Sequence, residues 1–130
     1  GVDAEIHELR GVRYEQVPVW LNACDTLLVT SFHEGSPTIV KEALACNLPV
    51  VSVPVGDVSQ RIEGIRGCYL AEPTPGDLAK ELHKVFMNPR RIEAGEAIRS
   101  LSIDHCARDL ASFYVDLLQV HEAQMATRFA

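Results

Sequence analysis

The pattern of apolar and polar residues alternates between short apolar runs and segments with helical spacing. Three runs, "TLLVTS", "LPVVSVPV" and "GCYLAEP", are rich in apolar residues and are bounded by turn residues. They predict buried strands at 26–31 and 48–55 and a shorter strand near a sheet edge at 67–73. The segment "AEIHELRG" at 4–11 alternates weakly and ends in glycine, which favours one more short strand.

The segments between these runs have helical spacing. In the helix predicted at 37–47, Ser36 suits the N-cap, Pro37 suits the first helical position and Asn47 suits the end. Asp57 is the expected cap of a short helix, and Gly95 interrupts a weaker one. The predicted helices lie at 14–25, 37–47, 56–65, 74–88, 89–101 and from 103 onward.

The last predicted helix carries a long apolar seam. Its members are spaced 3, 4, 3, 4 and 3 residues apart, which keeps them on one helical face. They are Ile103, Cys106, Leu110, Phe113, Leu117 and Val120. We expect this seam to cover the sheet or a domain that this chain lacks, or to form a homodimer.

Strands that alternate with helices predict an α/β fold. The expected architecture is a single domain over residues 1–130, with a Rossmann-like parallel sheet flanked by helices and a helical C-terminus. Continuous apolar strands fit a sheet that is covered on both faces. Ligands of such sheets bind where strands end and helices begin, so the loop "SFHEGSP" at 31–37 is the first candidate site.

Composition narrows the possible partners. The net charge is −6 without a basic patch, which argues against a nucleic-acid partner. No apolar run reaches the length of about 18 residues that a membrane span needs. The chain starts without methionine and in mid-element, so we expect a fragment of a longer protein.

The four cysteines form no C-x-x-C pair, and no histidine lies at metal-ligand spacing from them. They predict buried free thiols in a reducing cytoplasm. We expect neither a metal site nor a cofactor. His33 is the one histidine inside the candidate loop, where it either fills the loop or contacts a ligand.

Two glutamates, Glu34 and Glu42, stand on either side of the predicted helix start. Glu42 lies roughly 7 Å along the helix axis from Pro37, at a rise of ~1.5 Å per residue. Backbone N–H groups of Thr38 and Ile39 point into the space between the carboxylates, and the N–H of Ser36 is a third candidate donor. The arrangement suits a ligand with an anionic middle and hydroxyl-rich ends, because helix N-termini bind phosphate and carboxylates bind hydroxyls. A nucleotide-diphospho-sugar has this layout.

Other interpretations of the pair remain. Carboxylates separated by ~6.5–9.5 Å would suit the acid and base of an inverting glycosidase. Glu42 within a helix and a loop suited to phosphate disfavour that interpretation. Taken alone, Glu42 is typical of a solvated helix face and Glu34 of a solvated loop.

The stretch "EGSPTIVKEALACNLPVVSVPVG" resembles the E-x7-E region of retaining glycosyltransferases with the GT-B fold, family 4 or group 1. The preceding "VPVWLNACDTLLVTS" is similar to the same family, and the resemblance runs from about Gly11 to Leu70. It implies an enzyme that binds a nucleotide-sugar donor in its C-terminal domain and transfers the sugar to an acceptor with retention and without an essential metal.

The resemblance also implies roles for individual positions. Glu34, the catalytic candidate, would hydrogen-bond the donor sugar, and Glu42 would hold the ribose hydroxyls. The intervening backbone would meet the diphosphate and sugar, at Gly35, Ser36, Pro37, Thr38 and Ile39. Val12 and Arg13 would lie near the base, with weaker support. Pro37 stands where many members have glycine, and its missing N–H removes one phosphate contact.

The family's C-terminal domain normally opens with a strand and with an Arg and a Lys that clamp the diphosphate. Residues 1–130 do not contain these elements, so we expect them and the N-terminal acceptor domain to lie outside this sequence. We therefore expect a truncated donor-binding domain that is inactive alone. A nucleotide-sugar epimerase or a non-catalytic flavodoxin-like or receiver-type module are the alternatives, although a receiver would need acidic residues clustered after its first strand.

Overall fold

The computed structural model describes residues 2–128, without the side chains of residue 96 and residues 122–128. The chain forms two compact units that divide between Gly95 and Glu96. Each unit is described by itself. The first contains the sheet and the second is helical.

The sheet of the first unit has three parallel strands in the order β1-β2-β3. They are β1 (Leu27–Val29), β2 (Val50–Ser52) and β3 (Tyr69–Leu70). In the register, Val29 pairs with Ser52, so β1 and β2 end at the same edge of the sheet. All three residues of the central strand β2 are buried, as its continuous apolar sequence predicts.

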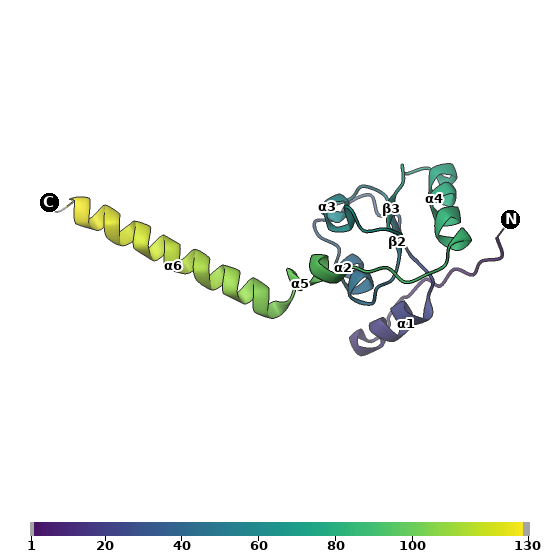
Figure 1. Ribbon diagram of the computed structural model, residues 1–130, viewed down its shortest axis with the longest axis horizontal. Coiled ribbons are helices and arrows are strands. Elements are labelled where there is room, and N and C mark those ends of the chain that lie inside the picture. The colour runs from purple at the N-terminus through teal and green to yellow at the C-terminus, as the bar shows by residue number, and fades with distance from the viewer. Residues whose placement is uncertain (1, 129–130) are drawn as a thin grey trace. The chain divides into compact units, whose positions relative to one another are not determined.

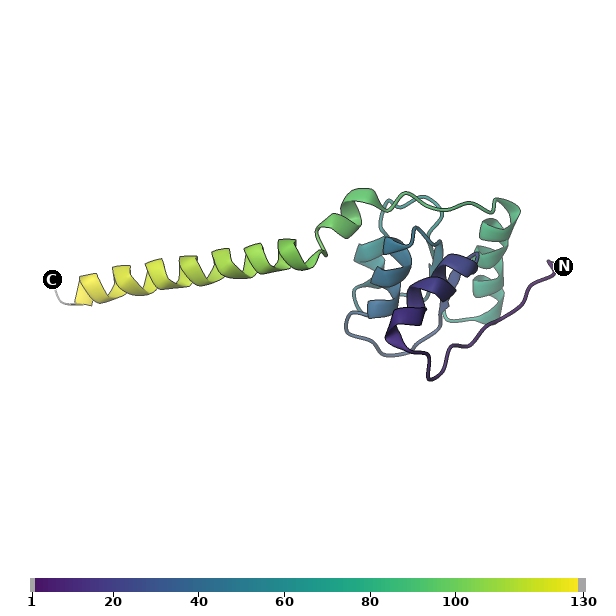
Figure 2. The same cartoon turned by 90° about the horizontal axis from the view of Figure 1, so that it is seen from below.

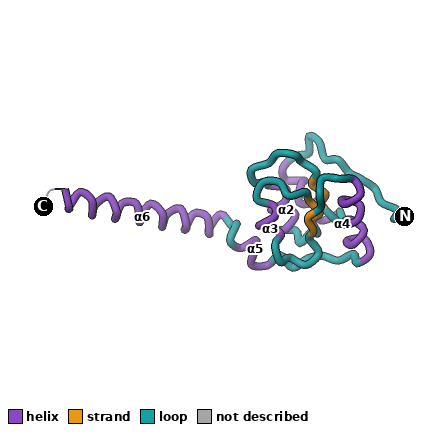
Figure 3. Tube along the Cα trace, turned by 90° about the horizontal axis from the view of Figure 1, so that it is seen from above, coloured by secondary structure: helices purple, strands orange, loops and turns teal. Residues whose placement is uncertain are grey.

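Helices cover both faces of this sheet. On one side lie α2 (Thr38–Ala45) and α3 (Val58–Ile62), and on the other lies α4 (Pro75–Met87) (Figures 1 and 3). The short 3-10 helix η1 (Tyr14–Gln16) continues into α1 (Val17–Ala23), which packs against α2 (Figure 2). The predicted parallel α/β architecture is therefore confirmed.

The core lies between α2 and the central strand. Val40, Ala43 and Leu44 recur at helical spacing on α2 and are at most 1% exposed. Val50 and Val51 of β2 are completely buried. Burying side chains of this size stabilises the fold by about 1.5–3 kcal/mol each, so this packing fixes where α2 lies on the sheet.

Asn47 terminates α2, as the sequence predicts, two residues after the last helical residue, Ala45. Asn47 has a left-handed backbone, with φ at 53°, which asparagine tolerates better than most residues. Its N–H donates to the carbonyl of Leu44 (2.9 Å), and the N–H of Leu48 donates to the carbonyl of Ala43 (2.9 Å). These two bonds form a Schellman motif, which terminates the helix and turns the chain into β2.

The segment 91–94 crosses back to α1 and α2. Arg91 donates to the carbonyl oxygens of Leu21 (3.2 Å) and Cys24 (3.0 Å), at the C-terminal end of α1. The N–H of Ile92 donates to the carbonyl of Asn47 (2.9 Å), and the N–H of Ala94 donates to the Asn47 side chain (3.3 Å). Both helix ends are thus capped by the same short segment.

Two predictions about secondary structure were wrong. Residues 2–10 form no strand; their side chains are exposed, and the weak alternation leaves no apolar face for packing onto the sheet. The helix predicted at 89–101 is helical only over α5 (Gly95–Arg99), because residues 91–94 instead bond to α1 and α2.

The second unit is dominated by α6 (Ile103–Arg128), which begins after Ser102 as predicted. The seam defined above is exposed along α6: Leu110, Phe113, Leu117 and Val120 are each about half exposed. Among the residues that the structure describes, no helix combines the length and apolar character that crossing a membrane requires.

The four cysteines are free thiols, as predicted. The expectation that they are buried was wrong. Cys24, Cys46 and Cys68 are half-buried and Cys106 is exposed. Burial raises the pKa of the Cys68 thiol, which keeps it protonated at neutral pH.

Candidate functional site

The candidate site lies at the carboxyl edge of the sheet, where the loops after β1 and β2 meet. A pocket of ≈ 580 Å³ opens between them. Its walls are Phe32, His33, Glu34, Gly35, Pro54, Val55 and Gly56. Two adjacent parallel strands thus send their following loops to one pocket, the usual place for a ligand in this class of sheet.

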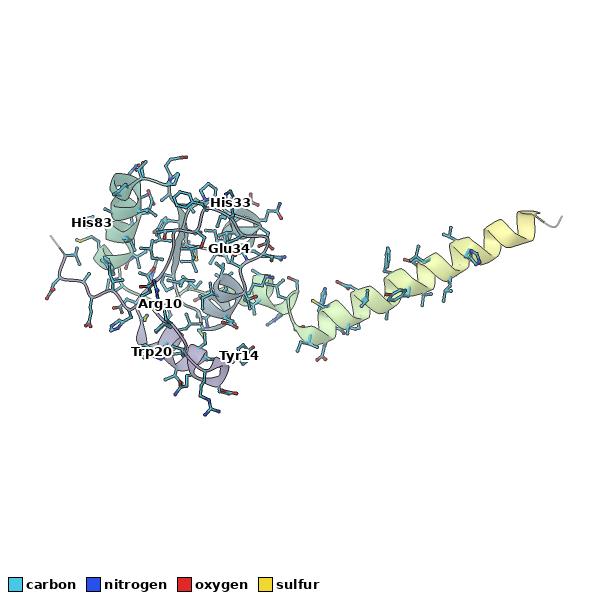
Figure 4. The ribbon with its side chains drawn as sticks, turned by 180° about the vertical axis from the view of Figure 1, so that it is seen from behind. Arg10, Tyr14, Trp20, His33, Glu34 and His83 are labelled. Carbon is cyan, nitrogen blue, oxygen red and sulfur yellow. The ribbon has the colours of Figure 1, made fainter. Side chains whose placement is uncertain are left out.

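Of the residues predicted for the site, Glu34 and Gly35 line this pocket. Figure 4 shows Glu34 and His33 near one another on the β1–α2 loop. Glu42 is half-buried on α2 and is not part of the pocket wall. Within the described part of the chain, neither glutamate side chain has a hydrogen-bond or ion-pair partner, so both remain able to accept hydrogen bonds from a ligand.

The N-terminus of α2 differs from the prediction by one residue. Pro37 is buried and occupies the N-cap, and the helix begins at Thr38. The N–H of Val40 donates to the carbonyl of Pro37 (3.2 Å). The N–H groups of Thr38 and Ile39 precede the first intrahelical bond, so they are the donors that this helix start offers.

Ser36 does not cap α2, contrary to the prediction. Its hydroxyl donates instead to Oδ2 of Asp57 (2.7 Å), at the start of α3. The charged acceptor wins because a hydrogen bond to a carboxylate is stronger than one between neutral groups. Asp57 occupies the N-cap position of α3, as predicted, but its side chain makes no capping bond.

The two loops of the pocket are also joined through their backbones. The N–H of Asp57 donates to the carbonyl of Gly35 (3.1 Å). Gly56 has φ at +54°, and a Cβ added there would lie 2.9 Å from the carbonyl carbon of Gly35. Only glycine fits both the backbone conformation and the close approach.

Asp57 is the most strongly bonded carboxylate of the site. Arg61, one turn along α3, donates from Nε to the same Oδ2 atom (2.8 Å). The bond from Ser36 holds the pKa of Asp57 below its ordinary value, with smaller contributions from Arg61 and Lys41, although burial acts in the opposite direction. Asp57 is therefore ionised at neutral pH.

Sequence reasoning missed the three residues that the loop after β2 contributes to the pocket wall, Pro54, Val55 and Gly56. Their signal was available, because they directly follow a predicted strand parallel to the first one. Phe32 was also missed and is 84% exposed. Arg13 does not line the pocket. Its Nε atom lies 3.5 Å from Oε2 of Glu15.

The candidate site lies within a segment that is similar to a known protein family. Residues 1–88 match the sequence profile of the family "Glycosyl transferases group 1". The match covers more than half of the chain. The chain belongs to the group 1 glycosyltransferases. No solved structure gave a significant match.

Curated members of this family share modest identity with the chain. It is 26% identical over 111 residues to a D-inositol 3-phosphate glycosyltransferase of Streptomyces bingchenggensis, covering 81% of this chain and 24% of the relative. The corresponding protein of Stackebrandtia nassauensis is 31% identical over 107 residues, covering 75% and 23%. The putative teichuronic acid biosynthesis glycosyltransferase TuaC of Bacillus subtilis is 48% identical over 44 residues, covering 34% and 11%. The chain thus spans a quarter or less of the length of these relatives.

Proposed function

We propose that the protein carrying this chain transfers a sugar from a nucleotide-diphospho-sugar to an acceptor, with retention at the anomeric carbon and without an essential metal. This chain supplies part of the donor site. Family membership supports the general activity. Retention and metal independence come from the resemblance of the segment around Glu34 and Glu42.

The observation that carries the proposal is the start of α2. Two glutamates without protein partners flank a helix N-terminus, and the free N–H groups of Thr38 and Ile39 lie between them in sequence. The N–H groups and the helix dipole favour the diphosphate. Glu34 accepts hydroxyls of the donor sugar, as the catalytic candidate, and Glu42 accepts hydroxyls of the ribose.

Electrostatic repulsion limits such a site but does not forbid it. A carboxylate at ~8 Å from an anion costs about 2 kcal/mol at an effective dielectric near 20. Each charge-assisted hydrogen bond to a hydroxyl contributes roughly 1.5–3 kcal/mol, which offsets that cost. Catalysis then consists mainly of orienting the donor and stabilising the departing diphosphate.

The test is calorimetric titration of the intact protein with UDP-, GDP- and ADP-sugars. We expect one nucleotide-sugar to bind and to support transfer with retention, as judged by the anomeric configuration of the product. Chelation of divalent metals should leave the rate unchanged. Binding of none of these donors contradicts the proposal, and epimerisation without transfer identifies a nucleotide-sugar epimerase.

The isolated 130 residues should not catalyse glycosyl transfer. They span a quarter or less of the relatives described above, and no cationic pair like the family's diphosphate clamp lines the described pocket. We assign acceptor choice to other parts of the protein. Detectable glycosyl transfer by this chain alone would contradict this part of the proposal.

We also propose that the seam of α6 pairs with the same seam of a second copy. Spacings of 3 and 4 residues give the 3.5-residue repeat of a two-stranded coiled coil. In a parallel pair, Asp116 of one helix lies beside His121 of the partner subunit, so that the imidazole can donate a hydrogen bond to the carboxylate. Free thiols, one of them exposed, fit our assignment of the protein to the reducing cytoplasm.

A further inference from the structure

The two loops of the pocket are held together by one residue, Asp57. Its backbone N–H donates to Gly35 (3.1 Å) and its carboxylate accepts from Ser36 (2.7 Å), so the same residue binds the β1–α2 loop at two consecutive positions. Arg61 fixes the carboxylate from the next turn of α3 (2.8 Å). Neither Asp57 nor Ser36 is part of the pocket wall itself, which Gly35, the neighbour of Ser36, helps to form.

The chemistry of this contact decides what Ser36 can offer to a ligand. An ionised carboxylate only accepts hydrogen bonds, so the single hydroxyl proton of Ser36 is committed to Asp57. The Ser36 oxygen keeps lone pairs that accept hydrogen bonds. A phosphate oxygen also only accepts, so it gains no hydrogen bond from the Ser36 hydroxyl, whereas a sugar hydroxyl can donate to the Ser36 oxygen.

The donors at the start of α2 complete this division. The N–H groups of Thr38 and Ile39 have no intrahelical acceptors, so a diphosphate is better placed there than at the Ser36 side chain. Both side chains that bond to the Asp57 carboxylate, Ser36 and Arg61, do so at Oδ2. The other oxygen, Oδ1, is buried and has no partner within the described part of the chain.

We propose that Asp57 is a positioning residue that orients Ser36 as a hydrogen-bond acceptor for a hydroxyl of the donor sugar. This inference rests on the proposed function, because it names the part of the donor that Ser36 contacts. Asp57 acts through Ser36 and through the backbone of Gly35, without touching the donor. Ser36 thereby distinguishes the sugar of the donor from its nucleoside diphosphate.

The test compares two ligands in the intact protein: the nucleotide-sugar that binds best among UDP-glucose, GDP-mannose and ADP-glucose, and the corresponding free nucleoside diphosphate. Ser36→Ala and Asp57→Ala should each raise the Kd of the nucleotide-sugar by about threefold to tenfold, the equivalent of one hydrogen bond between two neutral hydroxyl groups. The Kd of the nucleoside diphosphate should change less than about twofold in Ser36→Ala, since the Ser36 hydroxyl has no proton to donate to a phosphate and the substitution leaves the backbone N–H in place.

Steady-state kinetics separate positioning from general damage. The donor KM should rise with kcat within about threefold of the wild type, as expected for an interaction present equally in the bound and transition states. The double variant should lose no more than the worse single variant, because Asp57 acts through Ser36. Asp25→Ala, an exposed aspartate before β1, is the matched control and should change neither constant.

Three results would overturn the inference. The first is equal weakening of nucleotide-sugar and nucleoside diphosphate binding in Ser36→Ala. The others are additive losses in the double variant and an unchanged Kd and KM for the nucleotide-sugar in the single variants. If Asp57→Ala does not fold, the two-ligand comparison with Ser36→Ala alone decides, since Ser36 is exposed. If the wild type binds none of the nucleotide-sugars, the proposed function itself fails; if it binds one and the variants match it, only this inference fails.

Discussion

Gly56 and Gly35 lie so close that any side chain at position 56 would overlap the Gly35 carbonyl group. The two residues belong to loops that follow neighbouring strands, and both line the candidate pocket. Their contact therefore sets the separation of the pocket walls. It is supported on one side by the bond from the Asp57 N–H to Gly35.

Gly56→Ala should destabilise the first unit by about 1–3 kcal/mol, because the new Cβ meets Gly35 and the residue must keep a positive φ. Urea unfolding followed by circular dichroism measures the change. Gly76→Ala is the matched control: nothing lies within 4 Å of its added Cβ, and it stands in the first turn of α4. If Gly56→Ala loses no more unfolding free energy than Gly76→Ala, then the two loops can move apart without destabilising the fold.

Glu42→Ala in the intact protein should weaken donor binding by about 1.5–3 kcal/mol, because it removes one charge-assisted hydrogen bond. Calorimetry with the nucleotide-sugar that binds best gives the change directly. Glu63→Ala, an exposed glutamate after α3, serves as the control and should leave the affinity unaltered. Unchanged affinity in Glu42→Ala would remove its assigned role at the ribose.

The bonds of Asp57 should make stability depend on pH. Because the folded protein lowers the pKa of Asp57, ionised Asp57 stabilises the fold above the ordinary value of 3.8, and this contribution is lost as pH falls through and below that value. Urea unfolding at a series of acidic pH values should therefore show a smaller decline in Asp57→Asn than in the wild type. Parallel declines in the two proteins would show that Asp57 contributes nothing to the acid sensitivity.

Arg91→Ala should cost about 1–3 kcal/mol of unfolding free energy, because it leaves carbonyl groups at the end of α1 without their charged donor. Arg91→Lys should recover only part of the loss, since an ammonium cannot span several carbonyl groups as the planar guanidinium does. Arg90→Ala is the control, at an exposed neighbouring position. Thermal denaturation of the three variants should rank Arg91→Ala as the least stable.

Leu110→Asp should abolish the proposed pairing of α6, because it puts a charge at the centre of the seam. Leu118→Asp is matched in chemistry but lies off the seam, and it should leave a dimer intact. Sedimentation of the intact protein measures the oligomeric state of each. A monomeric wild type would show that the seam does not pair with a second copy.

The sheet could be predicted from sequence because its strands are short, continuous and apolar. Residues such as Val50 and Val51 are completely buried, and nothing but a strand covered on both faces suits such a run at that length. The left-handed end of α2 at Asn47 was equally predictable, because asparagine accepts that backbone conformation. Periodicity misled for residues 4–11, which alternate weakly but do not pair with any strand of the sheet.

The candidate loop was found from its position, but its internal bonds were not. Ser36 has the right type and position for a cap, and local reasoning cannot see that Asp57 is folded against it from another loop. The same holds for 91–94, where partners at Asn47 and Cys24 compete successfully with helix formation. Such contacts join segments that are far apart in sequence, so they depend on tertiary packing and cannot be predicted from the local residue pattern.

The bonds of segment 91–94 also fix where the first unit can be cut. The family match stops at residue 88, yet Ile92 and Ala94 beyond it are about as buried as the core. A chain shortened to the matched residues would expose the hollow that Ile92 fills beside Gly67 and would leave the carbonyl of Asn47 without its donor. We therefore expect a stable form of the first unit to extend at least to Ala94, and the family match alone would draw its boundary too early.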